Sequence, residues 1–139
     1  MTTPYLHHVF PMPVLQVSIG PVGEQPRLGP FEAIIDTGAD MTVLPLSLIR
    51  RVKAHPVGQG RIRGLWGDAH PVAFFLVELQ IQDARLPGVQ VAGDDAGREI
   101  IPGRNVLNQL PLFLDGPQQQ TEVLGDAATR WLRDRRKQG

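Results

Sequence analysis

The chain has 139 residues, of which 42% are hydrophobic, and its 14 basic side chains balance 14 acidic ones. These values are ordinary for one compact domain, and they leave no excess of positive charge for binding nucleic acid. Cysteine is absent, which excludes disulfides, a cysteine nucleophile and thiolate metal sites. The 15 glycines and 13 prolines favour turns and short strands, so we expect a mainly β fold.

Apolar runs that alternate or are rich in β-branched residues predict the strands. They lie at residues 14–19, 31–35, 41–45, 72–81 and 89–92, and residues 111–124 predict a closing hairpin. Because no internal repeat or linker interrupts this series, we expect one domain over residues 1–125, followed by a basic tail over residues 126–139.

A reactive carboxylate is expected between the strands at 31–35 and 41–45. The chain there reads Ile-Ile-Asp-Thr-Gly-Ala-Asp over residues 34–40. Gly38 permits a sharp turn, so Asp36 should lie at a loop tip held by two core strands. The alternative is that Asp36 caps an ordinary turn.

A second element, Ile-Ile-Pro-Gly-Arg-Asn, occupies residues 100–105 and precedes an apolar stretch at 106–110. Together the two elements resemble the motifs of the retropepsin-like aspartic proteases, and the resemblance covers about residues 13–125. It implies a closed acid-protease barrel with one short helix after the Gly-Arg-Asn element. Pro102 departs from the family, which usually has an aliphatic residue there, and its missing N–H leaves open a one-residue shift in the local pairing.

The resemblance also implies roles for individual residues. The catalytic residues would be Asp36, Thr37 and Gly38. The substrate-binding residues would be Ala39, Asp40, Gly64, Leu65, Trp66 and Gly67. Thr37 would hydrogen-bond across a two-fold axis. Apart from the resemblance, the opposite charges of Arg104 and Asp40 allow a charge-assisted pair that ties the helix to this loop. The alternative for Arg104 is a solvated surface side chain.

Aspartic proteolysis needs two carboxyls that share a proton, because like charges in contact cannot both ionise. One chain supplies one such carboxyl, since the other acid-glycine sites, at 94–97 and 115–116, lack the preceding apolar pair. Catalysis therefore requires a homodimer that brings two Asp36 residues together. One would activate water and the other would polarise the scissile carbonyl of a protein or peptide substrate, without a metal or a cofactor.

Residues 59–71 predict a hairpin whose tip is loosened by Gly64 and Gly67. In the family such a hairpin is a flap that closes over the substrate. Trp66 at its tip would then cover an extended peptide, with core packing as the alternative.

The tail at 126–139 carries five basic and two acidic residues, so its net charge is +3 and that of the preceding body is −3. Asp126 is a candidate helix N-cap, and Ala128, Trp131 and Leu132 share one helical face. We expect a short helix with Trp131 packed on the body. A docking or nucleic-acid-binding tail is the alternative.

Three function classes follow from these patterns. The leading one is a homodimeric aspartic endopeptidase. The second is a catalytically silent module of the same fold that dimerises or binds peptides, and the third is an unrelated small β-barrel binding domain. A cytoplasmic location without a membrane partner is expected, because the sequence shows neither a secretory signal nor an apolar run that spans a bilayer. Metal binding by the adjacent His7 and His8 is not expected, since neighbouring strand residues point to opposite faces.

Overall fold

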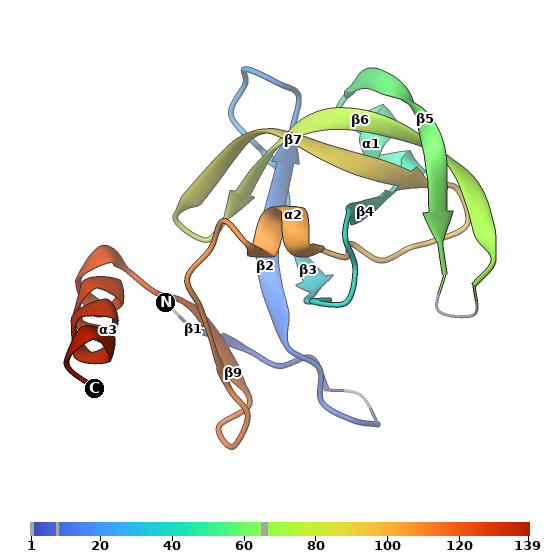
Figure 1. Ribbon diagram of the computed structural model, residues 1–139. Helices are drawn as coiled ribbons and strands as arrows, with labels where there is room; N and C mark the ends of the chain where they lie inside the picture. The colour runs from blue at the N-terminus through green and yellow to red at the C-terminus, as the bar shows by residue number, and fades with distance from the viewer. Residues whose placement is uncertain (1, 8, 65–66) are drawn as a thin grey trace.

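The computed structural model describes residues 2–7, 9–64 and 67–139, and its strands form two sheets (Figure 1). The large sheet has the order β3-β2-β6-β7-β4, and β5 pairs with β6. Its strands are β2 (Val14–Gly20), β3 (Leu28–Ile34), β4 (Thr42–Pro45), β5 (His55–Arg63), β6 (Ala69–Ile81) and β7 (Ala84–Asp94). The small sheet has the order β1-β9-β8, formed by β1 (Thr2–Pro4), β9 (Gln120–Val123) and β8 (Leu112–Asp115). The mainly β class and the expected strands are confirmed.

The large sheet is open rather than closed into a barrel, which differs from the closed form expected from the sequence. Its two ends, β3 and β4, are joined through the segment at residues 100–101 instead of pairing with each other. Ala33 bridges Ile100 in parallel, and Val43 bridges Ile101 in antiparallel orientation. This segment lies between β3 and β4, so it runs beside both ends of the loop that leaves β3 and leads into β4.

The core lies between the strands of the large sheet and the short helices, and it follows the period of two expected for strands with one buried face. Fully buried members include Leu15, Val17, Ile19, Leu44, Val77, Leu79, Ile81, Val91 and Val106. Burial of each such side chain contributes about 1.5–3 kcal/mol relative to an exposed one. The core therefore provides a rigid base for the loops at the ends of its strands.

In the described part of the chain three helices accompany the sheets: α1 (Leu46–Arg51), α2 (Arg104–Leu107) and α3 (Asp126–Gln138). α2 is the short helix expected after the Gly-Arg-Asn element. α1 was not expected from the sequence, and it places Ile49 in the core directly after β4. No helix in the described part of the chain has both the length and the apolarity needed to cross a membrane.

The C-terminal helix α3 forms as expected, but it does not pack as expected. Figure 1 shows it apart from both sheets, and none of its residues is buried. Trp131 is 59% exposed and contacts its own helix, with the Arg135 guanidinium 5.1 Å from the ring centroid. The expectation that Trp131 packs on the body is therefore wrong. Asp126 is the first helical residue, and the N-cap position belongs to Gly125, which lacks a side-chain cap.

Candidate active site

The loop that carries Asp36 is anchored at its start by the segment at residues 100–102. The Ile34 N–H donates to the Ile100 carbonyl at 2.8 Å, and the Asp36 N–H donates to the Pro102 carbonyl at 3.2 Å. From the first of these hydrogen bonds to the second, the donor and the acceptor each advance by two residues. Pro102 therefore causes no one-residue shift in the pairing. A proline fits this position because its carbonyl still accepts although it has no N–H to donate.

The loop turns tightly around the Asp36 carboxylate. Asp36 Oδ1 accepts the Gly38 N–H at 2.9 Å, and the Asp36 carbonyl accepts the Ala39 N–H at 3.2 Å. A Cβ on Gly38 would lie 3.2 Å from the same Oδ1, so the turn leaves little space for a larger residue. Asp36, Thr37 and Gly38 are all exposed. Among the described residues, the second carboxylate oxygen has no partner, which leaves it free for water or substrate.

Gly103 allows the helix α2 to approach this loop closely. A Cβ at this position would lie 2.7 Å from the Met41 carbonyl carbon and 2.9 Å from the Ala39 carbonyl oxygen. The close approach lets the Arg104 N–H donate to the Ala39 carbonyl at 2.8 Å. The backbone of α2 therefore fixes the second half of the Asp36 loop, and any side chain at Gly103 would push the two segments apart.

Arg104 joins the same loop through its side chain. Its guanidinium forms an ion pair with Asp40 and donates from Nη1 to the Thr37 carbonyl at 2.9 Å. The pairing of Arg104 with Asp40 expected from the sequence is confirmed. Arg104 is 44% and Asp40 87% exposed, so the pair contributes at most about 1 kcal/mol to stability, and its main effect is to orient the loop.

A partly buried polar network lies beneath the loop, and the sequence motifs did not assign it. Asn105 Oδ1 accepts both the Thr42 N–H, at 2.9 Å, and the Thr42 hydroxyl, at 2.8 Å. The Thr42 Oγ1 in turn accepts the Gly103 N–H at 3.0 Å, and Asn105 Nδ2 donates to the Gln90 carbonyl at 2.8 Å. The signal for this network is Asn105 itself, because an amide at the start of a short helix can bond to a neighbouring backbone.

The expected hairpin forms from β5 and β6, and it closes with Arg63 opposite Ala69. At its tip the Gly64 N–H donates to the Asp68 carbonyl at 2.9 Å, and Gly67 adopts a φ of +85°, which favours glycine. Leu65 and Trp66 lie outside the described residues. No hydrogen bond in the described part of the chain joins the tip to the Asp36 loop, so the flap role of the hairpin stays a prediction.

A pocket of about 670 Å³ lies between this hairpin and the core of the large sheet. Its lining includes Val43, Leu46, Ala73, Ala92 and Ile101, which are apolar, together with Asp94 and Asp95. Val43 and Ile101 pair with each other beside Pro102, whose carbonyl holds the Asp36 N–H. The pocket therefore flanks the loop that carries Asp36, although Asp36 does not line it.

Over residues 2–7, 9–64 and 67–139 the structure brings together no three His, Asp or Glu side chains that could hold a metal ion. The Asp36 loop itself presents three groups that can take part in chemistry. These are one accessible carboxylate, a neighbouring hydroxyl and the backbone of a tight turn.

Comparisons with known proteins agree with this geometry. A family model described as aspartyl protease matches residues 16–106, more than half of the chain. No curated protein sequence matches the chain significantly. Among solved structures, EIAV protease in complex with the inhibitor HBY-793 is similar, with a TM-score of 0.58 and 21% identity over 75% of this chain and 92% of that one. The retroviral protease-like domain of Ddi1 from Leishmania major is also similar, with a TM-score of 0.51 and 15% identity over 81% of this chain and 87% of that one. The chain belongs to the aspartyl protease family and has its retropepsin-like fold.

Proposed function

We propose that the protein is an aspartic endopeptidase whose active site forms when two chains meet at their Asp36 loops. The observation that carries this proposal is the Asp36 carboxylate, which is exposed at the tip of a loop fixed by α2 and by residues 100–102. A rigidly held carboxylate that faces solvent suits a role in chemistry, whereas a carboxylate that only caps a turn does not need such support from distant segments. The family match supports the same assignment.

The proposed reaction is general acid–base hydrolysis of a peptide bond. One Asp36 carboxylate takes a proton from a water molecule while the protonated Asp36 of the second chain donates a hydrogen bond to the scissile carbonyl oxygen. The water then attacks the carbonyl carbon, and the proton passes to the leaving nitrogen as the bond breaks. Thr37 and Arg104 would hold each loop in position, since Arg104 already binds the Thr37 carbonyl.

The experiment that tests the proposal is a cleavage assay on a diverse peptide library, with Asp36→Ala as the control. Cleavage by the native protein that is absent from the variant supports it. Peptide binding without cleavage would instead identify a catalytically silent module of the same fold. Cleavage by both proteins would remove Asp36 from the mechanism.

Activity should depend on protein concentration, because one chain contributes a single Asp36. Below the dimer dissociation constant, the rate per chain should fall nearly in proportion to the chain concentration. The measurement is the rate of cleavage of a fluorogenic peptide over a dilution series, with the dissociation constant obtained separately by analytical ultracentrifugation. A rate per chain that stays constant far below this constant would contradict a site shared between two chains.

Substrate preference should reflect the pocket beside the Asp36 loop. Its apolar lining suits aliphatic side chains next to the scissile bond, whereas Asp94 and Asp95 oppose an acidic side chain. Peptides with Glu at the position that enters the pocket should be cleaved about tenfold more slowly than peptides with Gln. The double change Asp94→Asn and Asp95→Asn should bring the kcat/KM values for the Glu and Gln peptides closer together. An unchanged ratio of these two values would show that the substrate side chain does not enter this pocket.

A further inference from the structure

A second cavity, of about 640 Å³, lies at the end of β2 that is distant from the Asp36 loop. It is bounded by Ile19 and Gly20 at the end of β2, by the following loop and by the C-terminal end of α1. Val14 at the other end of β2 pairs with Ile34, two residues before Asp36. Seven strand residues separate the two regions, a span of about 20 Å. The cavity is therefore independent of the proposed catalytic site.

Positive charge dominates the lining of this cavity. Arg27, Arg51 and Lys53 all line it and are exposed, whereas Glu24 is the one acidic residue among the described residues of the lining. Within the described residues, none of these three cations forms an ion pair or a side-chain hydrogen bond. The lining thus carries a net charge of +2 formed by side chains that are free to bind a ligand.

Lys53 occupies an unusual backbone position for a lysine. It follows the end of α1 with a φ of +52°, and its N–H donates to the Arg50 carbonyl at 3.1 Å. Helices commonly end with a residue in this left-handed conformation, and glycine is preferred there because it has no Cβ. A lysine at this position keeps a strained backbone while it places a cation at the cavity.

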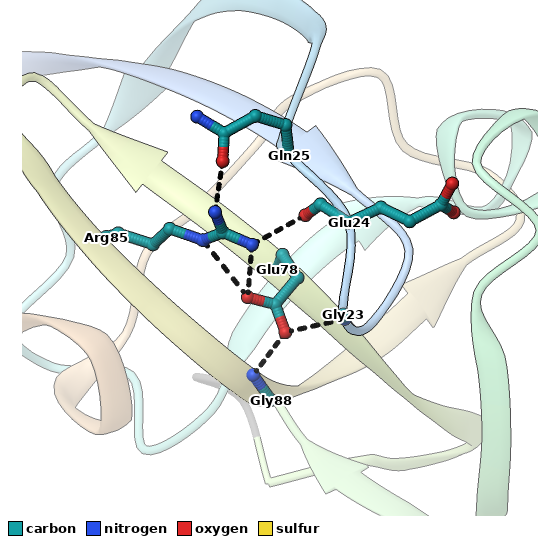
Figure 2. Close-up of polar contacts among 6 residues, drawn as sticks. All are labelled: Gly23, Glu24, Gln25, Glu78, Arg85 and Gly88. Carbon is teal, nitrogen blue, oxygen red and sulfur yellow. Dashed lines mark hydrogen bonds and ion pairs between the residues drawn. The ribbon is translucent and has the colours of Figure 1, made fainter.

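The opposite wall of the cavity is held by a buried carboxylate, that of Glu78, which is 3% exposed. Figure 2 shows the Glu78 carboxylate between the backbone N–H groups of Gly23 and Gly88, both at 3.2 Å, and the Arg85 guanidinium. Arg85 also donates to the Glu24 carbonyl at 2.8 Å and to the side chain of Gln25. The loop that forms this wall is therefore tied to β6 and β7 before any ligand arrives.

Gly20 brings the loop still closer to β2. A Cβ at this position would lie 2.8 Å from the Pro26 Cα and 3.0 Å from the Gln25 carbonyl oxygen. The wall is thus packed against the strand at one end and bound through Arg85 in its middle. Such a preorganised wall lowers the cost of ordering a binding site.

We propose that this cavity binds a small ligand that carries two or more phosphoryl groups. Arginine presents a planar set of donors that matches phosphoryl oxygens in pairs, and the two arginines with Lys53 can contact neighbouring phosphoryl groups. A ligand with at least two negative charges is required to balance the lining. The cavity volume lies within the range of small-molecule sites.

The test is calorimetric titration of the whole protein with inorganic triphosphate at low ionic strength. The double change Arg51→Gln and Lys53→Gln should weaken binding at least about tenfold, and Glu24→Gln should strengthen it. The matched control is Arg133→Gln with Arg136→Gln on α3, which removes the same charge from an exposed basic surface. Absence of binding by the native protein, or an equal loss in the control, would overturn the proposal.

Two further measurements extend this test. The first distinguishes a loss of ligand binding from a loss of folding stability, and the second identifies the source of the phosphoryl groups. Lys53→Gly should weaken triphosphate binding while the melting temperature stays constant or rises, because glycine relieves the left-handed strain. A nucleoside triphosphate that binds more tightly than triphosphate indicates a nucleotide, and equal affinity indicates that the phosphoryl groups alone are recognised. An acidic peptide that binds as tightly as triphosphate would contradict phosphoryl recognition. Asp36→Asn should leave this binding unchanged, so the site can be tested whether or not the protein cleaves peptides.

Discussion

Asp36→Asn should abolish peptide hydrolysis and leave the fold intact. The amide can still accept the Gly38 N–H through its oxygen, as Asp36 Oδ1 does at 2.9 Å, but it can neither take a proton from water nor give one to the leaving nitrogen. A positioned general acid or base contributes about 10²–10⁴-fold to a rate, and a dimer would lose both groups at once. We therefore expect a fall in kcat of about 10⁴-fold or more, measured with a fluorogenic peptide alongside the circular dichroism spectrum.

Asp115→Asn is a suitable control for this experiment. Asp115 also caps a turn, since its Oδ1 accepts the Gln118 N–H at 3.1 Å, but it lies in the β8–β9 hairpin. The control should retain normal kcat. Substantial activity in the Asp36 variant, or an equal loss in both variants, would show that the carboxylate of Asp36 is not the reacting group.

Glu78→Gln should produce the largest loss of stability among single changes of a charged residue. Burial raises the pKa of the Glu78 carboxyl, but hydrogen bonds from Gly23 and Gly88, together with Arg85, outweigh this effect and hold the pKa below its ordinary value of 4.5. The Gln amide would leave Arg85 without its counter-ion. Its NH2 group would also face N–H groups that now donate hydrogen bonds to the carboxylate. Because Arg85 keeps contact with solvent, we expect a loss of about 2 kcal/mol in the free energy of unfolding, measured by urea denaturation at neutral pH.

The same change should alter how stability depends on pH. A carboxyl whose pKa is lower in the folded state stabilises the protein above its unfolded pKa, and this contribution disappears as the pH falls through the folded pKa. The difference in the free energy of unfolding between the native protein and the Glu78→Gln variant should therefore be largest at pH 7 and shrink below about pH 4.5. Glu32→Gln, on the exposed side of β3, should show neither effect. A difference in unfolding free energy that stays constant with pH would indicate that the variant loses packing rather than the charge of Glu78.

The features of the site that sequence could predict are those with a local cause. Gly38 is a glycine because the backbone turns sharply there, and the apolar runs on either side of Asp36 mark the two strands that hold it. The pairing of Arg104 with Asp40 followed from complementary charges in two motifs. The network between Thr42 and Asn105 was not assigned because these neutral side chains, 63 positions apart, carry no complementary charges by which to match them.

Elements without a local signal were missed for physical reasons. Residues 46–51 form the helix α1, but this six-residue segment after Pro45 has only three apolar side chains and is too short to show a helical period. Alternation along β6 gave no sign that Glu78 is buried, because the loop that covers it comes from residues 23–25. The apolar face of α3 was visible in the sequence, but its pattern does not say what, if anything, covers Trp131.

The pairing of β1 with β9 within one chain has a consequence for how an active enzyme would assemble. Thr3 lies opposite Thr121, so β1 and β9 of the same chain pair with each other and the small sheet forms within a single protomer. Each protomer can therefore reach its native structure in a unimolecular process, and the encounter of two Asp36 loops follows as a separate bimolecular event. In such a system a cell could hold folded but idle protein and switch proteolysis on by raising its abundance or by gathering it in one place.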